Sequence, residues 1–406
     1  MGVKSLDPDV TVIGAGPAGL LAAKECADSG CHVIVFEEHN KVGEPDHCAG
    51  LLSFSGLKSL GLKLPERVIQ NQVSGARIYS PDGTDVLIER GHREAFVVDR
   101  SAFDSWLAES AENSDVQIMT NTKVQGVKTG DSSKYRLSLQ SEGATSDIQS
   151  KVVVNAEGFR CRISKIIGLP IVPKSSMYPA YQYEVRNAEV DDDLVEMYYG
   201  RHISSGFFLW NIPLGDGRAR IGLASRDRAK IRLDAAMKHH PTLSQKLKKA
   251  SIERGFGGVV LVGMPIKRTY DDGVVVVGDA AGIVKATTGG GVILGGIAAK
   301  IAGKQVADAI QTGDVSSNFL RRYEERWQSE MKKELRMMFL AQKMISSLSD
   351  KGLDSLILDL KRSGLLETVR ELGDMDKQSR VIAGLLRDPR TLLAGLKAIR
   401  YVNPLL

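Results

Sequence analysis

The sequence predicts an α/β protein with a parallel-sheet domain, a mostly antiparallel second domain and a helical C-terminal region. A β-branched run, a glycine-rich turn and a helical segment follow one another near the N-terminus. A second strand, glycine turn and helix lie around residue 279, and beyond residue 315 apolar residues recur at helical spacing. A chain of 406 residues is long enough for two or three domains.

The N-terminal pattern alternates strand, turn, helix and strand. Residues 9–13 are a short β-branched run, and Gly-Ala-Gly-Pro-Ala-Gly follows directly. Residues 20–29 have the composition of a helix, which Gly30 ends, and residues 31–36 are again apolar. This order predicts a βαβ unit whose helix begins at the glycine turn.

The glycines of this turn have the spacing that a dinucleotide requires. Gly14 permits a tight turn, Gly16 lets the backbone approach a pyrophosphate, and Gly19 lets the helix pack on the strand. The helix N-terminus presents N–H groups to the phosphates, and an acid after the second strand accepts hydrogen bonds from ribose. Chance resemblance is the alternative, but strand, helix and acid agree here. The expected contacts are Gly14, Gly16, Pro17, Ala18, Gly19, Glu37 and Glu38.

The second glycine motif distinguishes FAD from NAD. Residues 273–277 are predicted to form a strand, and a glycine run precedes a helix predicted for residues 293–310. An Asp at a strand end can bind ribityl hydroxyls, and N–H groups at a helix start stabilise the negative charge of a reduced flavin. The alternative is a turn whose glycines serve packing only. The expected FAD contacts are Gly278, Asp279, Gly289, Gly290, Gly291 and Val292.

Together with an arginine between them, the two motifs resemble the flavoprotein fold of p-hydroxybenzoate hydroxylase. The resemblance implies a Rossmann-like FAD-binding domain in which Arg100 reaches the flavin phosphates or ribityl chain, with a surface salt bridge as the alternative. It also places Val124 where backbone groups meet the adenine. Where that family has Asp-Gly after a strand, this sequence has Glu157 and Gly158, which weakens an expectation of direct NADPH contact.

Three segments resemble the geranylgeranyl reductases more closely, above all the archaeal enzymes that saturate isoprenoid lipid chains. Residues 43–53 are similar to a cysteine-containing loop near the flavin, and residues 208–213 to the YxWxFP motif. Residues 288–291 match the glycine run, although Lys285 and Ala286 replace the Asp and Pro that often precede it. The resemblance covers nearly the whole chain.

The resemblance implies hydride transfer from reduced flavin to one alkene carbon and protonation of the other. Cys48 is the expected proton donor or steric gate and His47 its relay partner, with Ala49 and Gly50 as further flavin contacts. The alternatives are a buried structural cysteine and a solvent-facing histidine. Ala49 departs from the glycine that the family more often has.

An apolar chain needs an apolar site that excludes water. Alternation on a predicted strand places Phe208, Trp210 and Ile212 on one face, and ordinary sheet packing is the alternative. The expected substrate contacts are Phe208, Trp210, Ile212, Pro213 and Tyr181.

The expected FAD-binding domain is discontinuous, and the substrate domain fills the gaps between its parts. Strands are predicted for both parts of the substrate domain, with a helix over residues 234–254. In the C-terminal region helices are predicted for residues 318–348, 354–360, 365–372 and 391–402, the last basic and amphipathic. The division assigns 1–72, 99–168 and 269–310 to the FAD-binding domain, 73–98 and 169–268 to the substrate domain, and 311–406 to the helical domain.

Composition limits the cellular setting and the partners. Hydrophobic content of 43% and charged content of 25% are typical of a soluble globular protein. No apolar signal-peptide core and no run of about 18 apolar residues is present, so no membrane-spanning helix is predicted. The four cysteines lack zinc spacing, so we expect no metal and a reducing cytoplasm. The net charge of +5 is modest, and no nucleic-acid partner is expected.

Basic residues outnumber acidic ones from Lys300 onward. This surplus favours peripheral contact with anionic lipid at the inner face of the cell membrane. A solvated helical surface explains it equally well.

The leading hypothesis is an FAD-dependent oxidoreductase acting on CH–CH groups, which saturates geranylgeranyl chains of membrane lipids or their precursors. One alternative is a flavin-dependent monooxygenase or halogenase of the same fold, because residues 208–213 also resemble the halogenases' WxWxIP motif. Others are a menaquinone side-chain reductase and a flavin-binding protein without turnover. NADPH and ferredoxin both remain open as electron donors, and the second would be a partner protein.

Overall fold

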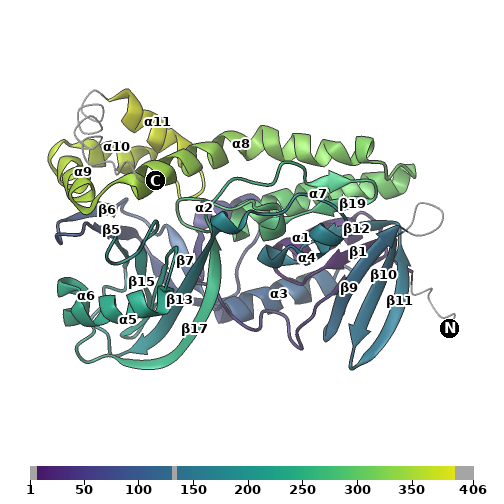
Figure 1. The fold of residues 1–406 in the computed structure, drawn as a ribbon, viewed down its shortest axis with the longest axis horizontal. Coiled ribbons are helices and arrows are strands. Elements are labelled where there is room, and N and C mark those ends of the chain that lie inside the picture. Colours follow the sequence, from purple (N-terminus) through teal and green to yellow (C-terminus); the bar gives the residue numbers. More distant parts are fainter. Residues whose placement is uncertain (1–6, 130–134, 389–406) are drawn as a thin grey trace. The chain divides into compact units, whose positions relative to one another are not determined.

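The computed structural model describes residues 7–129 and 135–388, whose elements are labelled in Figure 1. These residues form two compact units, each built from three separate stretches of the chain. Unit 1 takes the residues up to 46, then 100–176 and 263–335. Unit 2 takes residues 47–99, 177–262 and those from 336 on.

A six-stranded sheet forms the centre of unit 1. All neighbouring strands are parallel except the edge pair β18–β19. The inner strands read VTVI, VIVF, VVVN and VVV and are buried throughout, as expected for a parallel sheet covered on both faces. The strand order is β18 (Tyr270–Asp271), β19 (Val274–Val276), β12 (Val152–Asn155), β1 (Val10–Ile13), β2 (Val33–Phe36) and β8 (Gln117–Met119).

Helix α1 (Pro17–Asp28) begins directly after the glycine turn, with Pro17 in the first turn where its missing N–H costs nothing. It packs against α3 (Arg100–Glu112) and α7 (Val292–Thr312). The contact with α7 is close, because a Cβ on Gly303 would lie 2.7 Å from the Ala22 carbonyl oxygen. The predicted βαβ unit and the predicted helix after the second glycine motif are therefore confirmed.

A three-stranded antiparallel sheet, which the sequence analysis did not anticipate, also belongs to unit 1. Its central hairpin turns at Glu142 and Gly143, both with positive φ, as a two-residue turn between twisted strands requires. The short helix α4 (Arg162–Ile166) contacts its first strand. The strands are β9 (Thr122–Thr129), β10 (Tyr135–Ser141) and β11 (Ala144–Ser150).

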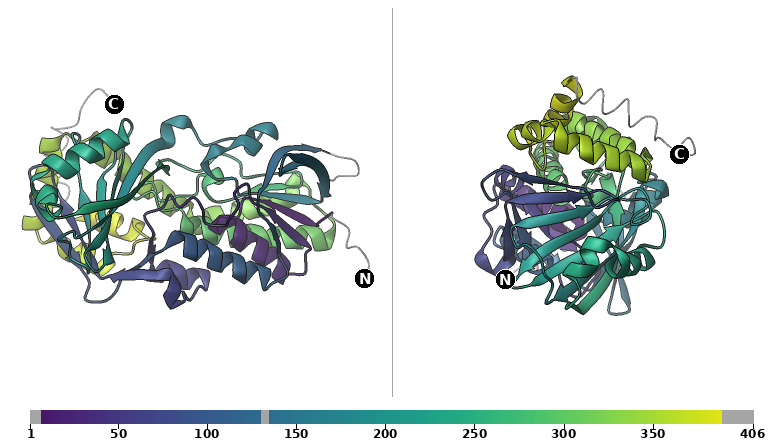
Figure 2. Two further views of the ribbon diagram at one scale, coloured as in Figure 1. Left: turned by 90° about the horizontal axis from the view of Figure 1, so that it is seen from below. Right: turned by 90° about the vertical axis from the view of Figure 1, so that its left-hand side faces the viewer.

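Unit 2 is built on a seven-stranded sheet in which only β14 and β5 pair in parallel. Helices α5 (Ala229–His239) and α6 (Pro241–Lys246) cover one face of this sheet, which Figure 2 shows from two sides. The mostly antiparallel character predicted for the second domain is confirmed. The order is β17 (Ser251–Leu261), β13 (Met177–Arg186), β16 (Arg218–Ala224), β15 (Leu209–Gly215), β14 (Leu194–Tyr198), β5 (Gly75–Tyr79) and β6 (Asp85–Glu89).

The helix predicted for residues 234–254 was wrong at its C-terminal end. Helix α6 ends at Lys246, and Ser251 begins β17, which pairs with β13 over its whole length. Three glycines in β17 make it a poor helix, and a Cβ on Gly255 would lie 2.7 Å from the Tyr183 ring. Pairing with β13 therefore outweighs the local composition that predicted a helix up to residue 254.

The sequence-based division grouped residues 47–72 with residues 1–46, but in the structure they pack in unit 2. A small antiparallel sheet explains this difference. Strand β7 (Ala95–Val98) lies between β3 (Leu51–Ser53) and β4 (Ile69–Val73) and pairs with both. Helix α2 (Phe54–Leu60) follows β3 and is capped by the Ser53 hydroxyl. The observed units also differ from that division at residues 169–176, 263–268 and 311–335, all of which belong to unit 1. The expected helical domain is not a separate unit, because residues 336–388 belong to unit 2.

The C-terminal helices are α8 (Ser317–Ser347), α9 (Asp350–Arg362), α10 (Leu365–Leu372) and α11 (Ser379–Arg387). The first three match predicted helices, α11 was not predicted, and the helix expected at residues 391–402 lies outside the described residues. Within the described part of the chain, no helix is both long and apolar enough to cross a membrane.

Candidate active site

The N-terminal glycine turn is shaped by close backbone contacts. Gly14 has a φ of +98°, and a Cβ there would lie 2.6 Å from the Ala156 carbonyl oxygen. A Cβ on Gly19 would lie 2.0 Å from the Gly14 carbonyl oxygen, so only glycine fits. The space beside Gly16 is free, because a Cβ there would meet nothing within 4 Å.

Gly16 is also the N-cap of α1 and makes no side-chain cap. No side chain therefore caps the first N–H groups of α1, which lie at the positive end of the helix dipole. Both features fit a pyrophosphate, which would occupy the space beside Gly16 and accept hydrogen bonds from these N–H groups. Pro17 and Ala18 are the first residues of the same helix.

Glu37, at the end of β2, is directed back toward the turn. One carboxylate oxygen accepts a 2.8 Å hydrogen bond from the Ala15 N–H. The other accepts from the His39 N–H at 3.0 Å and lies 2.6 Å from the His39 imidazole. The side chain keeps 13% exposure, so the fixed carboxylate is accessible to a ribose.

Glu38 and Val124 both have partners within the protein. The Glu38 carboxylate pairs with Lys123 at 2.7 Å, a hydrogen bond that lowers the pKa of Glu38 against the opposing effect of burial. Val124 is buried, and its carbonyl accepts a hydrogen bond from Arg162.

The early and late glycine motifs meet in unit 1. Gly278 opens a short 3₁₀ turn with a φ of +62°, and a Cβ there would lie 2.8 Å from the Ala18 Cβ. Asp279 follows it, and a Cβ on Gly291 would lie 2.6 Å from the Asp279 carboxylate. The strand-end aspartate is therefore held against the start of α7.

Burial raises the pKa of Asp279, and the Arg100 cation acts in the opposite direction. Arg100 also binds Asp104 through three hydrogen bonds of 3.0–3.1 Å. Burial raises the pKa of Asp104 as well, again against Arg100. With only 12% of its side chain exposed, Arg100 forms a largely buried ion pair with Asp104 rather than a surface salt bridge.

The glycine run before α7 forms a closed turn. The Gly289 N–H donates to the Lys285 carbonyl at 2.7 Å, and the Lys285 N–H donates to the Gly290 carbonyl at 3.0 Å. The Lys285 side chain is buried against Gly290. Gly291 is the N-cap and Val292 the first residue of α7, and no side chain caps this helix.

Glu157, which replaces the aspartate expected after β12, acts as a cap. Its carboxylate accepts hydrogen bonds from the N–H groups of Ile163 and Ser164, at 2.7 and 2.8 Å, and from the Asn155 amide at 2.8 Å. The longer side chain thus reaches the first turn of α4. The departure from the family's sequence has a structural role inside unit 1.

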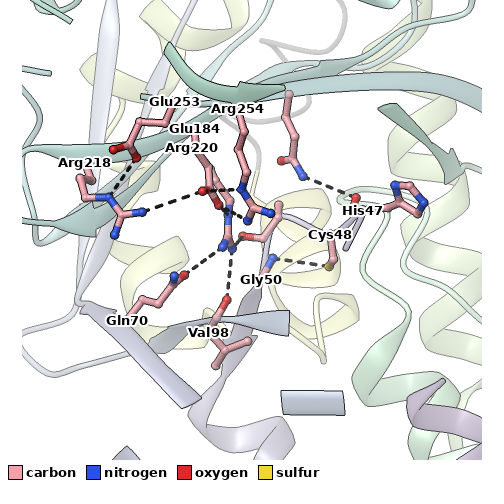
Figure 3. A network of polar contacts seen from close by, with 12 residues as sticks. His47, Cys48, Gly50, Gln70, Val98, Glu184, Arg218, Arg220, Glu253 and Arg254 are labelled. Carbon is pink, nitrogen blue, oxygen red and sulfur yellow. Dashed lines mark hydrogen bonds and ion pairs between the residues drawn. The ribbon is translucent and has the colours of Figure 1, made fainter. Parts of the chain in front are cut away.

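Residues 47–53 of the loop with Cys48 belong to unit 2. Of the four cysteines, all within the described residues, only Cys48 is not buried. Its sulfur accepts a hydrogen bond from the Gly50 N–H at 3.4 Å. His47 is exposed, and Figure 3 shows its imidazole directed away from the Cys48 sulfur. The expected relay from His47 to Cys48 is therefore not formed in this arrangement.

An apolar cluster covers the face of the seven-stranded sheet opposite α5. Phe208, Trp210 and Ile212 lie in it as alternation predicted, at 5%, 8% and 3% exposure. The Phe208 and Trp210 rings meet edge to face at 6.2 Å. Ala49, next to Cys48, packs against the same cluster. Two segments singled out in the sequence, the cysteine loop and the Trp210 motif, are thus side by side within unit 2.

Gln182 links these two segments and had no signal in the sequence. Its side-chain oxygen accepts from the Trp210 indole at 3.3 Å, and its amide donates to the His47 carbonyl at 3.5 Å. Gly222 makes room for the indole, since a Cβ there would lie 2.7 Å from the ring.

The structure does not bring Tyr181 to the Trp210 cluster. Successive residues of a strand face opposite sides, so Tyr181 shares the α5 face with Tyr183, at 5.2 Å between ring centroids. Pro213 is buried in β15. Among the residues described, no three His, Cys, Asp or Glu side chains gather as a metal site would need.

The paired glycine turns and the strand-end carboxylates define the class of protein: a flavoprotein with the p-hydroxybenzoate hydroxylase fold, that is, an FAD-dependent oxidoreductase. A family model described as an FAD binding domain matches residues 7–336. The chain belongs to this family and, by its relatives, to the geranylgeranyl reductases, as the sequence predicted.

Two relatives and one structure illustrate the match. Digeranylgeranylglycerophospholipid reductase 2 of Methanopyrus kandleri is 32% identical over 371 residues, which cover 89% of this chain and 92% of that protein. The reductase of the same name from Methanothermobacter thermautotrophicus is 32% identical, covering 93% and 99%. A geranylgeranyl bacteriochlorophyll reductase-like protein from Thermoplasma acidophilum superposes with a TM-score of 0.86 at 26% identity, covering 96% and 98%.

Halogenases share the fold only. A flavin-dependent brominase has a TM-score of 0.72 at 18% identity, covering 97% of this chain and 99% of its own. At that identity the likeness concerns architecture and carries nothing about the reaction.

Proposed function

We propose that this protein reduces carbon–carbon double bonds of geranylgeranyl chains in a membrane lipid or its precursor. The observation that carries the proposal is the packing of Ala49, from the cysteine loop, against the aromatic cluster around Trp210. A proton-bearing thiol beside an apolar surface suits an alkene substrate that has no polar group at its reacting carbons. The relatives named as digeranylgeranylglycerophospholipid reductases support the same substrate class.

Several residues of unit 1 have the groups that FAD needs. The N–H groups at the start of α1 would hold the pyrophosphate, Glu37 the ribose and Asp279 the ribityl hydroxyls. The N–H groups at the start of α7 would stabilise negative charge on the flavin ring. When bound and reduced, FAD supplies the hydride that adds to one alkene carbon.

The residues of unit 2 supply the remaining requirements. Phe208, Trp210 and Ile212 exclude water and hold the apolar chain. Cys48 holds the proton that the second alkene carbon takes up, and the Gly50 N–H, which donates to its sulfur, stabilises the thiolate that remains. Solvent returns the proton afterwards. NADPH or a ferredoxin-like protein reduces the flavin between turnovers.

The proposal is tested by anaerobic reoxidation. Purified protein loaded with FAD is reduced with dithionite, excess reductant is removed, and a geranylgeranyl glycerophospholipid is added without oxygen. We expect the oxidised flavin spectrum to return and mass spectrometry to show two hydrogen atoms added per double bond reduced. A saturated phytanyl lipid serves as control.

A flavin that reoxidises only when oxygen is admitted would contradict the proposal and favour a monooxygenase or halogenase. Reoxidation by menaquinone but not by the phospholipid would move the substrate to a quinone side chain.

A further inference from the structure

Arg220 is a fully buried cation in unit 2 to which the proposed reaction assigns no role. It lies in β16, on the same face of the sheet as Trp210, and is directly opposite Ile212 of β15. Its side chain has 0% exposure. Burying a guanidinium is costly unless every N–H finds an acceptor, so its partners indicate what it does.

One partner is a carboxylate that neutralises its charge. The Arg220 Nε donates to Glu184 at 2.8 Å, and Arg254 donates to the same carboxylate through two 2.7 Å hydrogen bonds. Burial acts to raise the pKa of Glu184, but these two arginines outweigh it and lower the pKa to about 2. Glu184 therefore stays ionised and fixes the orientation of the guanidinium plane.

The other partners are the peptide groups around the cysteine loop (Figure 3). The Arg220 Nη1 donates to the carbonyls of Ala49 and Val98, both at 3.1 Å, and Nη2 donates to the Gln70 side chain at 2.9 Å. Ala49 directly follows Cys48. The cation thus binds the peptide group between Ala49 and Gly50, the same peptide group whose N–H donates to the Cys48 sulfur.

Gly50 shows that this approach is built into the loop. It has a φ of +77°, and a Cβ there would lie 2.5 Å from the Arg220 Nη1 and 2.4 Å from the Val98 carbonyl oxygen. The Gly50 carbonyl accepts from the Val98 N–H at 2.8 Å, while its own N–H donates to the Cys48 sulfur. Only glycine lets the loop turn, contact β7 and receive the guanidinium at once.

We propose that Arg220 is a positioning residue that sets the direction of the Cys48 thiol by holding the Ala49 carbonyl. The inference rests on the proposed function, in which Cys48 delivers the proton. A lysine could keep the charge at position 220 but could not bridge Glu184 and two carbonyls, because it lacks the planar fork of donors. The direction of the thiol therefore depends on the guanidinium itself.

The test compares Arg220→Lys with Arg218→Lys in the FAD-loaded protein. Arg218 lies in the same strand and is 41% exposed, and its ion pairs are with Glu253 at 3.3 Å and, more weakly, with Glu184 at 3.9 Å rather than with the loop. The readout is the rate of iodoacetamide modification of Cys48 as a function of pH, followed by mass spectrometry. The other three cysteines are buried, so the modification reports on Cys48.

We expect Arg220→Lys to shift this pH profile and to raise the modification rate several-fold, because the loop is released. In alkene reduction kcat falls by about ten-fold or more while KM changes little, since a misplaced proton donor slows the chemical step. Arg218→Lys should match the wild type in both assays. An unchanged modification profile in Arg220→Lys would overturn the proposal and leave Arg220 a structural residue.

A second pair of variants covers the case in which Arg220→Lys does not fold. Gly50→Ala pushes a methyl group against the guanidinium, whereas Gly61→Ala has a similar φ of +71° and meets nothing within 4 Å. Only Gly50→Ala should alter the modification of Cys48, and equal profiles for the two would also overturn the proposal. If the wild type fails to reduce the lipid, the proposed function falls, but the modification assay still decides whether Arg220 sets the thiol.

Discussion

At the residue scale, two glycines of the first turn, Gly16 and Gly19, are required for different reasons. A Cβ on Gly19 would lie 2.0 Å from the Gly14 carbonyl oxygen, whereas one on Gly16 would meet nothing within 4 Å. Gly16 also has a φ of −73°, which any residue adopts without strain. Gly19 is therefore needed for folding, whereas Gly16 is needed for binding the cofactor.

We therefore predict that Gly16→Ala leaves the melting temperature of the FAD-free protein unchanged while FAD affinity falls. The added methyl group occupies the space of the pyrophosphate, and overpacking of about 1–3 kcal/mol corresponds to roughly 5- to 150-fold in Kd. Fluorescence titration of the FAD-free protein with FAD measures the change. Gly19→Ala is the contrasting variant and should lower the melting temperature or abolish folding. Normal FAD affinity in Gly16→Ala would refute the pyrophosphate assignment.

At the element scale, a row of charges crosses three adjacent strands of unit 2. Arg254 of β17 and Arg220 of β16 are the register partners of Glu184 of β13, so all three side chains share one face. The pKa of Glu184 is about 2, against an ordinary value of 4.5. A carboxyl whose pKa is lowered on folding stabilises the protein above its unfolded pKa and loses that contribution as the pH falls through its folded pKa.

The second prediction concerns this loss of stability as the pH falls. Between about pH 4.5 and pH 2, the unfolding free energy of the FAD-free wild type should fall more steeply than that of Glu184→Gln, by roughly 3 kcal/mol over the window. Urea unfolding at several pH values measures both slopes. Glu253→Gln removes a carboxylate that is 32% exposed and should keep the wild-type slope. Parallel curves for the wild type and Glu184→Gln would contradict the prediction.

At the scale of the whole molecule, the FAD motifs fall in unit 1, and the cysteine loop and the Trp210 motif fall in unit 2. The chain carries a net charge of +5, with a basic surplus from Lys300 onward. A lipid substrate is reached at a membrane surface, and anionic headgroups attract a positively charged protein. We propose peripheral contact with the inner face of the cell membrane.

We predict that the protein floats with vesicles that contain phosphatidylglycerol and much less with phosphatidylcholine vesicles. High salt should release it, because screening shortens the range of the attraction. Flotation on a density gradient measures the bound fraction. Equal binding to both kinds of vesicle, or binding that salt does not weaken, would argue against an electrostatic contact.

The sequence by itself determined the two glycine turns and the helices that begin at them. A pyrophosphate is held by consecutive backbone N–H groups, so the spacing of Gly14, Gly16 and Gly19 is enough to predict the turn and the helix that begins there. The same holds for Asp279 and for the glycine run before α7. Alternation likewise placed Phe208, Trp210 and Ile212 on one face, because the period of a strand is a local property.

Only the tertiary structure decided which distant segments meet. That Glu184 lies opposite Arg220 and Arg254 depends on the register of three strands, and a shift of one residue would turn every side chain to the other face. The same register placed Tyr181 on the α5 face and made residues 251–261 a strand instead of the end of a helix. Pairing of β3 and β4 with β7 carried the cysteine loop into unit 2. Local composition holds no record of these pairings, because the hydrogen bonds that specify them join residues far apart in the chain.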